Sequence, residues 1–436
     1  MKKIIAFALC LLLAISLVGC GGNGNSTSDN KATDIKIDID KNSKADLRFA
    51  ITVDPSEKKI AEAFINGFNK TYPNIKINIE PIAGDYKTQL LSQVASNTLP
   101  DISWVPDNWV SIFAEKNVLL NLDPYIQASK LDLSDFYDSM LKMGKKYHKG
   151  SQYMMPRDYN QVVVYYNKDL FDEAKLAYPK DGWSWDEFVQ TAKKLTKYKD
   201  GKIEQYGVNA MLYWPPVYQA IIQGFGGKLL DDKGNSLLNS DNAKQALNAM
   251  NDLVKSGATF NPFNPPPVDA FLSEKAAMAF APRPVMRSFY DASINFDVVT
   301  FPKLTTPVTG CGTSGYGISA KTKYPNETWA FLSYMVSKDG QLEFSKTGSA
   351  VPVLKSLAND PTWQNFPTPK YNHQAFVKFP EYNQVVDYLD GVPIEAQGDI
   401  EGKILNMLSD LFSQKKSVDQ VISECDEAIK KVYETQ

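Results

Sequence analysis

The chain has 436 residues, of which 43% are hydrophobic and 22% charged, and its formal net charge is −3 at pH 7. This length exceeds what one hydrophobic core usually holds, so we expect two domains. No block of basic residues interrupts the chain, which excludes nucleic acid as an expected partner. The two histidines and four cysteines lack metal-site spacing, so we expect no metal and no cofactor.

The first 20 residues have the features of an export signal. Two lysines precede an apolar run over residues 4–18, which is shorter than a transmembrane helix requires and fits a secretory signal peptide. The run ends in Leu-Val-Gly before Cys20, an ending that resembles the lipobox of bacterial lipoproteins. The resemblance implies a signal peptide over residues 1–19, lipidation of Cys20 and attachment to the outer face of the cytoplasmic membrane. The alternative is an ordinary signal peptide followed by a chance cysteine.

Predicted strands and helices alternate in the first half of the chain. Residues 20–45 are rich in Gly, Asn, Ser and Thr, which predicts a flexible tether, and the folded body is expected from residue 46. A buried strand is predicted at 47–52, and Asp54-Pro55-Ser56-Glu57 then predicts a helix start with a capping box. Further strands are predicted at 75–79 and 102–105, with a helix between them. This β-α-β-α-β order is typical of a parallel sheet covered by helices.

A second alternation of predicted strands and helices begins with a strand at 162–166. Its helix is predicted to begin after Ser184, which opens another capping box, and the last helix is predicted to begin after Ser417. The apolar stripe of that last helix includes Cys425, which favours a core position over a chemical role. The sequence does not decide whether Cys311 and Cys425 pair.

Several segments together resemble the extracellular solute-binding proteins of ABC importers, in the carbohydrate-binding group that includes maltose-binding protein. The similar segments, in the family's order, are residues 68–121, YMMPRDYNQVVVYYNKDLFDEA (153–174) with WSWDEFVQTAKKLT (183–196), FLSEKAAMAFAPRP (271–284) and GYGISAKTKYPNETWAFLSYMVSKDGQ (315–341). No single motif is decisive, but their order and spacing cover nearly the whole chain after the signal. The lipobox agrees with this resemblance independently.

The resemblance implies an α/β fold of the type II periplasmic-binding-protein class. Two lobes, each a mostly parallel sheet flanked by helices, would enclose a cleft and be joined by crossovers near 156–158, just after Pro284 and near 333–338. The N-lobe is then expected at 46–157 plus 286–335, and the C-lobe at 158–285 plus 336–436.

The resemblance also implies a function. A monomeric protein would capture a carbohydrate, preferably an oligosaccharide, by lobe closure and deliver it to an ABC permease in the membrane. An enzyme is disfavoured because the sequence has no nucleophile elbow, zinc-protease helix or phosphate-binding lysine loop. Two alternatives stay open, a sensor or adhesion lipoprotein with the same fold and a protein that binds a solute other than a sugar.

Ligands of open α/β sheets bind beyond the carboxyl ends of the strands. That rule selects Asp54 after the first predicted strand, and Trp104, Asp107 and Asn108 after the third. A sugar needs polar partners for its hydroxyls and aromatic rings for its C–H faces, and these residues supply both. The alternative for Trp104 is a core position on its strand.

Two further groups of candidates follow from the resemblance. Arg157, Asp158 and Asn160 fall at the expected hinge and would face the cleft, although a plain salt bridge between Arg157 and Asp158 is nearly as good an explanation. Trp214 stands before two prolines and therefore favours a loop over the cleft. Tyr218 belongs to the same aromatic segment, or simply to the helix that follows.

One segment departs from the family's pattern. Where many relatives have Gly-x-Trp, this chain has Ala-Pro-Arg-Pro around Arg283. Because arginine binds carboxylates in a bidentate way, one hypothesis is an acidic ligand, such as one with a uronic acid unit. The favoured alternative is an arginine that bonds sugar hydroxyls or a local aspartate. Ser314 and Tyr316 are expected to add a hydroxyl and a ring to the cleft, and Asp387 and Tyr388 are weaker candidates.

Overall fold

The computed structural model describes residues 35–384 and 392–434. Within these ranges no helix combines the length and the apolar character that crossing a membrane requires. The predicted signal peptide, Cys20, Asp387 and Tyr388 lie outside the described residues, so the predictions for them stay predictions.

The first sheet has the strand order β2-β1-β3-β12-β4. Strand β1 pairs in parallel with β2 and β3, as the β-α-β-α-β rhythm predicts, whereas β12 runs antiparallel to both β3 and β4. Alternate side chains of β1 are fully buried, which places this sheet against a core. The strands are β1 (Ala45–Thr52), β2 (Ile75–Ile82), β3 (Ile102–Pro106), β4 (Met155–Pro156) and β12 (Ser314–Ile318).

Helix α1 (Pro55–Phe68) begins where the sequence predicts. The Asp54 carboxylate accepts a hydrogen bond from the Ser56 N–H at 2.8 Å and caps the helix. The predicted capping box is wrong, however, because the Glu57 carboxylate pairs with Arg157 instead. The other helices between the first-sheet strands, or packed on α1, are α2 (Tyr86–Ala95), α3 (Val110–Glu115), α4 (Asp123–Ser129), α5 (Asp138–Met143), α11 (Pro325–Val336) and α12 (Lys338–Ser345).

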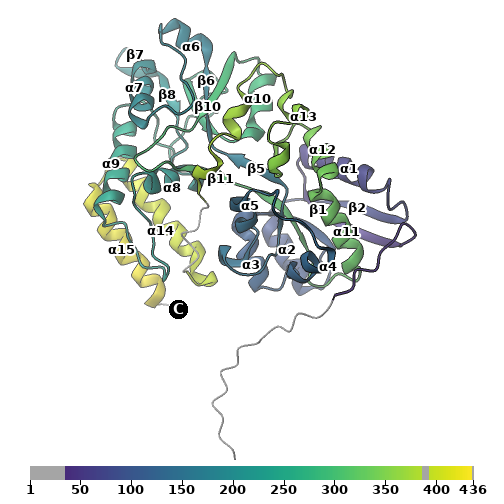
Figure 1. The fold of residues 1–436 in the computed structure, drawn as a ribbon. Helices are drawn as coiled ribbons and strands as arrows, with labels where there is room; N and C mark the ends of the chain where they lie inside the picture. The colour runs from purple at the N-terminus through teal and green to yellow at the C-terminus, as the bar shows by residue number, and fades with distance from the viewer. Residues whose placement is uncertain (1–34, 385–391, 435–436) are drawn as a thin grey trace, which may run out of the picture. The chain divides into compact units, whose positions relative to one another are not determined.

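The second sheet has the strand order β10-β6-β9-β8-β7. Figure 1 labels its strands β6, β7, β8 and β10. Only β8 and β9 pair in parallel, so this sheet has fewer parallel pairs than the resemblance implies. The antiparallel pairs are β10 with β6, β6 with β9 and β7 with β8. The strands are β6 (Val163–Asn167), β7 (Lys197–Lys199), β8 (Lys202–Asn209), β9 (Ala276–Ala281) and β10 (Phe296–Thr300).

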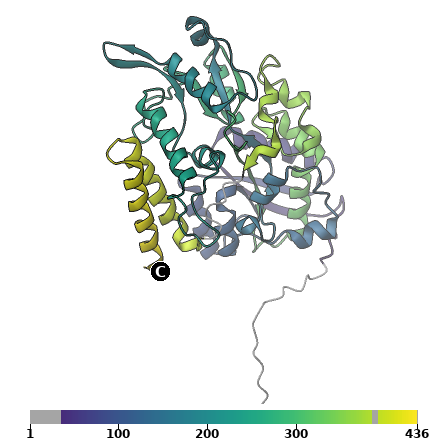
Figure 2. The same ribbon diagram turned by 60° about the vertical axis from the view of Figure 1, so that its left-hand side comes forward.

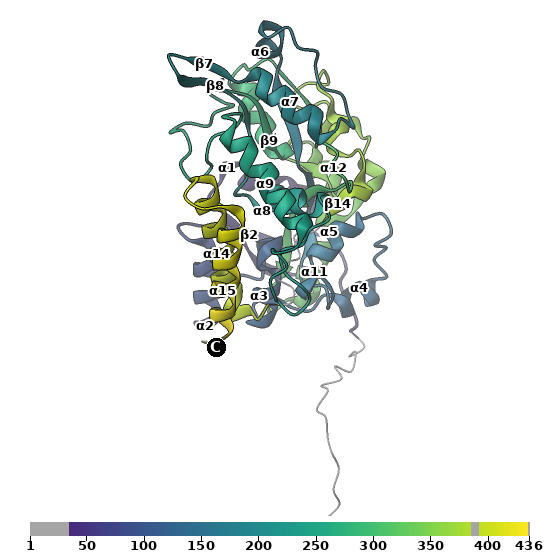
Figure 3. The ribbon, with the colours of Figure 1, turned by 90° about the vertical axis from the view of Figure 1, so that its left-hand side faces the viewer.

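The helices around the second sheet bury a core of their own. Helix α7 has the predicted capping box at Ser184, and Cys425 lies in the core on the buried stripe of α15, as predicted. Helices α14 and α15 lie side by side as a pair next to α9, as Figures 2 and 3 show. These helices are α6 (Lys168–Glu173), α7 (Trp185–Leu195), α8 (Pro215–Gly224), α9 (Asp241–Lys255), α14 (Ile394–Phe412) and α15 (Val418–Glu434). The short helix α10 (Met286–Asp291) buries its apolar side chains in the other core, together with those of the first sheet.

A small third sheet, here called the central sheet, has the order β13-β5-β11-β14. Its two middle strands are parts of the connections between the other sheets, since β5 runs from β4 to β6 and β11 runs from the end of β10 to β12. A short helix, α13 (Pro361–Gln364), follows β13. The strands are β5 (Asp158–Gln161), β11 (Thr309–Gly312), β13 (Val351–Pro352) and β14 (Asn383–Gln384).

The central sheet fixes where the chain passes between the larger sheets. The chain passes from the first sheet to the second at 156–158 and returns to the first sheet at 312–314. The lobe crossovers expected near 156–158 and just after Pro284 stay predictions. The predicted N-lobe range 286–335 contributes β10 to the second sheet, and α12 from the predicted C-lobe packs on α1. The division of the chain between the lobes therefore stays a prediction.

Candidate functional site

The two connections lie side by side in the central sheet. The Arg157 N–H donates to the Ser314 carbonyl oxygen at 2.8 Å, and Gly312 of β11 lies opposite Asn160 of β5. Residues that are far apart in the sequence therefore meet at one place, and several of them are predicted site residues.

Arg157 is the centre of this meeting point, with 5% of its surface exposed. Its Nη1 donates to Glu57 Oε2 at 2.7 Å and to the Tyr316 hydroxyl at 3.1 Å. Its Nη2 donates to Asp158 Oδ2 at 3.0 Å and to Ser314 Oγ at 2.9 Å. The guanidinium donors are thus used by protein groups, which favours the salt-bridge explanation over direct contact with a ligand.

Asp158 joins the two connections from the other side. Its carboxylate accepts hydrogen bonds from the Ser314 N–H at 2.9 Å, the Ser314 hydroxyl at 3.0 Å and the Thr313 hydroxyl at 3.2 Å. It also accepts from Asn160 Nδ2 at 3.0 Å. Among the described residues, the buried Oδ1 of Asn160 has no hydrogen-bond partner. We call Glu57, Arg157, Asp158, Thr313 and Ser314 the crossover network.

Asp107 ties the end of β3 to the same network. Its Oδ2 accepts from the Thr313 N–H at 3.1 Å, and its Oδ1 accepts from the Asn108 N–H at 2.7 Å. Burial raises the pKa of Asp107 to about 6, although these two hydrogen bonds and the nearby His148 act in the opposite direction. Asn108 itself is exposed, so its amide is accessible at the carboxyl end of β3.

An aromatic cluster stands beside Asp107. The partly buried Trp104 packs edge-on against Tyr86, with ring centroids 5.7 Å apart, and against Trp109 at 6.1 Å. Within the described ranges the buried Trp104 Nε1–H lacks a hydrogen-bond partner. Trp109 is partly exposed and was not predicted as a site residue, although it stands two residues after Asp107 in the same motif. The cluster combines partly exposed aromatic rings with a buried, unused indole donor, in the same chain segment as the Asp107 carboxylate.

The aromatic segment before α8 is only partly exposed. Trp214 is the residue before the helix, and prolines occupy the first helical positions. Tyr218 is fully buried in the second core, which corrects its expected place at a cleft. Tyr213, which was not predicted, is 43% exposed. Gln219 is 2% exposed, and neither end of its amide has a hydrogen-bond partner among the residues that the structure describes.

Arg283 lies away from the crossover network and is 1% exposed. Its Nη2 donates to the carbonyl oxygens of Trp363 at 3.0 Å and Phe366 at 2.7 Å, and its guanidinium lies over the rings of Trp363 and Phe376. Burial lowers the pKa of Arg283 to about 10. These contacts give Arg283 a structural explanation, so the hypothesis of an acidic ligand rests on the sequence alone.

Seven of the twelve predicted ligand-binding residues are connected by hydrogen bonds in the structure, either directly or through Thr313. Asp54 is exposed and caps α1, and it makes its hydrogen bonds within that turn. The connected residues are Asp107, Asn108, Arg157, Asp158, Asn160, Ser314 and Tyr316.

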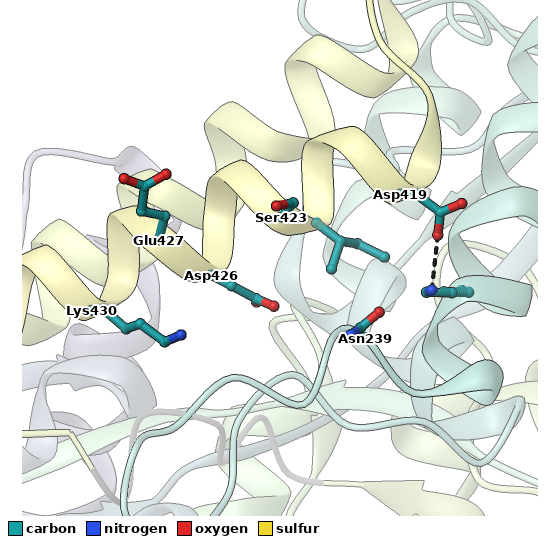
Figure 4. A pocket seen from close by; sticks show the side chains of 8 residues that line it. Asn239, Asp419, Ser423, Asp426, Glu427 and Lys430 are labelled. Atoms are coloured by element: carbon teal, nitrogen blue, oxygen red, sulfur yellow. Dashed lines mark ion pairs between the residues drawn. The ribbon is translucent and has the colours of Figure 1, made fainter.

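A surface hollow of about 410 Å³ lies elsewhere, between α15 and the chain that enters α9 (Figure 4). Both charge signs line it, and Lys244 pairs with Asp419 at 2.8 Å. No group of three metal-binding side chains occurs in the described part of the chain. The lining residues are Asn239, Lys244, Asp419, Ile422, Ser423, Asp426, Glu427 and Lys430.

Known proteins resemble this chain over most of its length. The galactooligosaccharide-binding protein of Bacillus subtilis is 23% identical over 379 residues, which cover 83% of this chain and 82% of that protein. Among solved structures, an ABC substrate-binding protein of Listeria monocytogenes in complex with cycloalternan has a TM-score of 0.75 at 24% identity, over 90% of this chain and 99% of that one. UgpB of Mycobacterium tuberculosis, solved with glycerophosphocholine, also has a TM-score of 0.75, at 19% identity over 90% and 100%.

The structural likeness establishes the fold, a two-lobed mixture of helices and sheets shared with periplasmic binding proteins. These proteins bind substrates and are not enzymes. The family model for bacterial extracellular solute-binding proteins matches residues 54–342, more than half of the chain. The chain belongs to the family of bacterial extracellular solute-binding proteins.

Proposed function

We propose that this protein captures a carbohydrate outside the cytoplasmic membrane and delivers it to an ABC permease. The observation that carries the proposal is the aromatic cluster of Trp104 and Trp109 beside Asp107. Partly exposed rings, a buried indole N–H without a partner and a carboxylate, all from one short chain segment, are groups that suit a sugar. The relatives named for a galactooligosaccharide and a cycloalternan support the same class of ligand.

The ligand contacts in this proposal are Trp104, Asp107, Asn108, Asn160 and Trp214. They combine aromatic rings with amide and carboxylate groups, and Asn160 brings an unused acceptor from the central sheet. An oligosaccharide suits such a site because several rings in a row give it several platforms.

The proposed mechanism is closure of the two lobes on the ligand. Closure reports occupancy only if the ligand binds the closed state more tightly than the open state, since equal affinity shifts no equilibrium. The permease then recognises the closed form, and a separate ATPase supplies the energy. We also propose that the protein acts as a monomer.

A thermal-shift screen of the full chain tests the ligand class. Neutral and acidic oligosaccharides are compared with glycerophosphocholine, peptides and polyamines. A ligand at 100 times its dissociation constant adds about 2.7 kcal/mol of stability. A shift with one family of glycans supports the proposal, whereas shifts only with the other solutes contradict the carbohydrate assignment and leave the fold unaffected.

A pair of asparagine variants then tests the site. Asn108 is exposed at the end of β3, and Asn248 is exposed on α9. We expect Asn108→Ala to weaken the binding of the identified glycan about tenfold, because one buried hydrogen bond to the ligand is lost. Asn248→Ala is the matched control and should leave the affinity unchanged. If both variants bind the glycan with the affinity of the wild type, the ligand does not contact Asn108.

We also propose that Cys20 carries the membrane anchor. A single acyl chain binds a membrane only weakly, whereas two chain types on one residue hold a protein firmly. Cys20→Ser should move the protein from the membrane fraction to the medium and abolish palmitate labelling. If Cys20→Ser stays in the membrane fraction and is still labelled with palmitate, Cys20 is not the membrane anchor.

A further inference from the structure

The last part of the predicted tether packs on the folded body. Within residues 35–39, which we call the strap, three isoleucines are half-buried against the first core, and the residues between them are exposed. This alternation is typical of an extended segment that turns one side towards the protein. The isoleucines are Ile35, Ile37 and Ile39, and the exposed residues are Lys36 and Asp38.

Two side-chain amides of the body hold the strap and the residues that follow it. Asn326, the second residue of α11, donates from its Nδ2 to the Lys36 carbonyl oxygen at 3.3 Å. Asn74, which stands just before β2, donates from its Nδ2 to the Lys41 carbonyl oxygen at 3.4 Å. In the part of the chain that the structure describes, no backbone hydrogen bond joins the strap to a strand. The packing of the isoleucines is therefore the main contact that keeps the strap in place.

The strap lies at the edge of the first sheet where the parallel strands begin. Strands β1 and β2 start together, since Ala45 pairs with Ile75, and Asn74 precedes that pair. Strand β12 runs antiparallel to β3, so its last residue, Ile318, and the start of α11 lie at the same edge. The candidate site around Asp107 follows the end of β3, at the opposite edge. The chain therefore enters the body on the side of the first sheet that is away from the candidate site.

The strap also limits how far the body can move from an anchor at Cys20. A chain spans at most about 3.6 Å per residue. The span from Cys20 to Ile35 is then at most about 54 Å, whereas the span from Cys20 to Ala45 without the strap is at most about 90 Å. Because volume increases with the cube of the span, docking of the strap reduces the volume open to the point of attachment roughly fivefold. Confinement of this kind raises the effective concentration of an anchored protein at a partner in the same membrane.

We propose that the strap holds the anchored protein close to the membrane and fixes the side on which its tether joins the body. The inference rests on the proposed anchor at Cys20 and goes beyond it, because it assigns the control of reach to a segment of the folded body. The half-buried isoleucines are the residues that carry this role, and the ligand site takes no part in it.

A triple serine variant of the full chain, which replaces all three isoleucines of the strap, tests whether the strap is docked. Trypsin digestion measures docking, because a protease cleaves a segment that detaches from the body. We expect cleavage after Lys41 to be at least about tenfold faster than in the wild type. The matched control, Lys36→Ser with Asp38→Ser, changes two exposed side chains of the same segment and leaves the net charge unchanged. It should be cleaved after Lys41 at the rate of the wild type.

Energy transfer from a dye on the protein to a labelled lipid then measures the reach. Lys323→Cys introduces an exposed thiol just before α11 for the dye, and Cys311 and Cys425 are buried. The anchored proteins are compared in vesicles made from the membranes of the cells that express them. We expect a loss of energy transfer in the triple serine variant relative to the wild type and the control, because its attachment point can move farther from the membrane.

The readouts separate this inference from the proposed anchor. If the triple serine variant is cleaved at the wild-type rate, the strap is not docked and the inference is wrong. If it is cleaved faster but shows the energy transfer of the wild type, the strap does not set the reach and the inference is equally wrong. If the wild type itself does not stay with the membrane, the proposed anchor fails, and the cleavage rates alone decide whether the strap is docked. Circular dichroism checks the fold, and Ile37→Ser, with a smaller expected increase in cleavage, replaces the triple variant if that variant does not fold.

Discussion

Arg157 and Arg283 are both buried arginines, and both were predicted to bind the ligand, but their surroundings differ. Arg157 meets the carboxylates of Glu57 and Asp158, whereas Arg283 meets two backbone carbonyl oxygens, a sulfur atom and two aromatic rings. No carboxylate of the described residues pairs with Arg283. Burial disfavours the charge on both, yet the pKa of Arg157 is raised by Glu57 and that of Arg283 falls to about 10.

The difference shows how the fold uses a buried cation in two ways. Around Arg157 the charges compensate one another and connect three separate chain segments. Around Arg283 the guanidinium fills a space between aromatic rings and satisfies carbonyl groups near α13. Buried polar groups with charged partners and buried polar groups without them should therefore respond differently to substitution.

The largest effect is expected for Arg157→Met. This substitution leaves the carboxylates of Glu57 and Asp158 buried with no cation beside them, which costs about 3–5 kcal/mol. Urea denaturation monitored by circular dichroism measures the loss. A loss below about 1 kcal/mol would mean that water or other groups already screen these carboxylates, and the comparison with Arg283 would fail.

Arg283→Met should have a smaller effect. The substitution removes an uncompensated cation and leaves the carbonyl groups of Trp363 and Phe366 without this donor, so we expect a loss of about 1–3 kcal/mol. The same denaturation experiment compares the two methionine variants directly. If Arg283→Met costs as much as Arg157→Met, an unseen anion compensates Arg283, and the hypothesis of an acidic ligand regains support.

Asp107 and His373 extend the comparison to pH. Burial raises the pKa of Asp107 to about 6, so the folded state binds the extra proton and stability increases as the pH falls from 6 towards 4. Burial lowers the pKa of His373 to about 4, although its hydrogen bond to Thr368 acts in the opposite direction, so stability decreases as the pH falls from 6.5 to 4. The two effects oppose each other in one pH range.

Single substitutions should therefore expose each effect. As the pH falls below 6.5, the free energy of unfolding of Asp107→Asn should decrease more steeply than that of the wild type. As the pH falls from 6 to 4, the free energy of unfolding of His373→Gln should increase. Each effect is at most about 3 kcal/mol, and smaller for Asp107 because its side chain is partly exposed. The measurement is the free energy of unfolding at each pH. Identical slopes in both variants and the wild type would show that neither group titrates as described.

Local patterns predicted the elements that depend on local interactions. Asp54 caps α1, Ser184 opens the capping box of α7, and the strand–helix order gives the parallel part of the first sheet. The partner of Glu57 was not predictable from its own segment, because Arg157 lies 100 residues away. A capping box and a distant ion pair compete for the same carboxylate, and only the folded chain decides between them.

In the candidate site, too, contacts between distant chain segments were not predictable from local patterns. The motif around Asp107 predicts ligand contacts at the end of β3, and in the structure Trp109 of the same motif packs against Trp104. The role of Arg283 depends on Trp363 and Phe366, which pack against it from a distant segment that carries no periodic signal. The passage of residues 309–314 between the second and the first sheet was not predicted either, because nothing in these residues marks a passage between sheets.

The smallest effect is expected for Gln219→Leu, which applies the comparison to uncharged groups. Gln219 and Gln205 are both buried, but only Gln205 has a partner, since its Nε2 donates to the Leu195 carbonyl oxygen at 2.7 Å. Because an unsatisfied buried amide carries a desolvation cost, Gln219→Leu should stabilise the protein by about 1 kcal/mol, while Gln205→Leu should destabilise it by a similar amount. Thermal denaturation of both variants measures the difference. A loss of stability in Gln219→Leu would mean that a bound water or the closed lobe already satisfies the amide, and Gln219 would then belong with the compensated groups around Arg157.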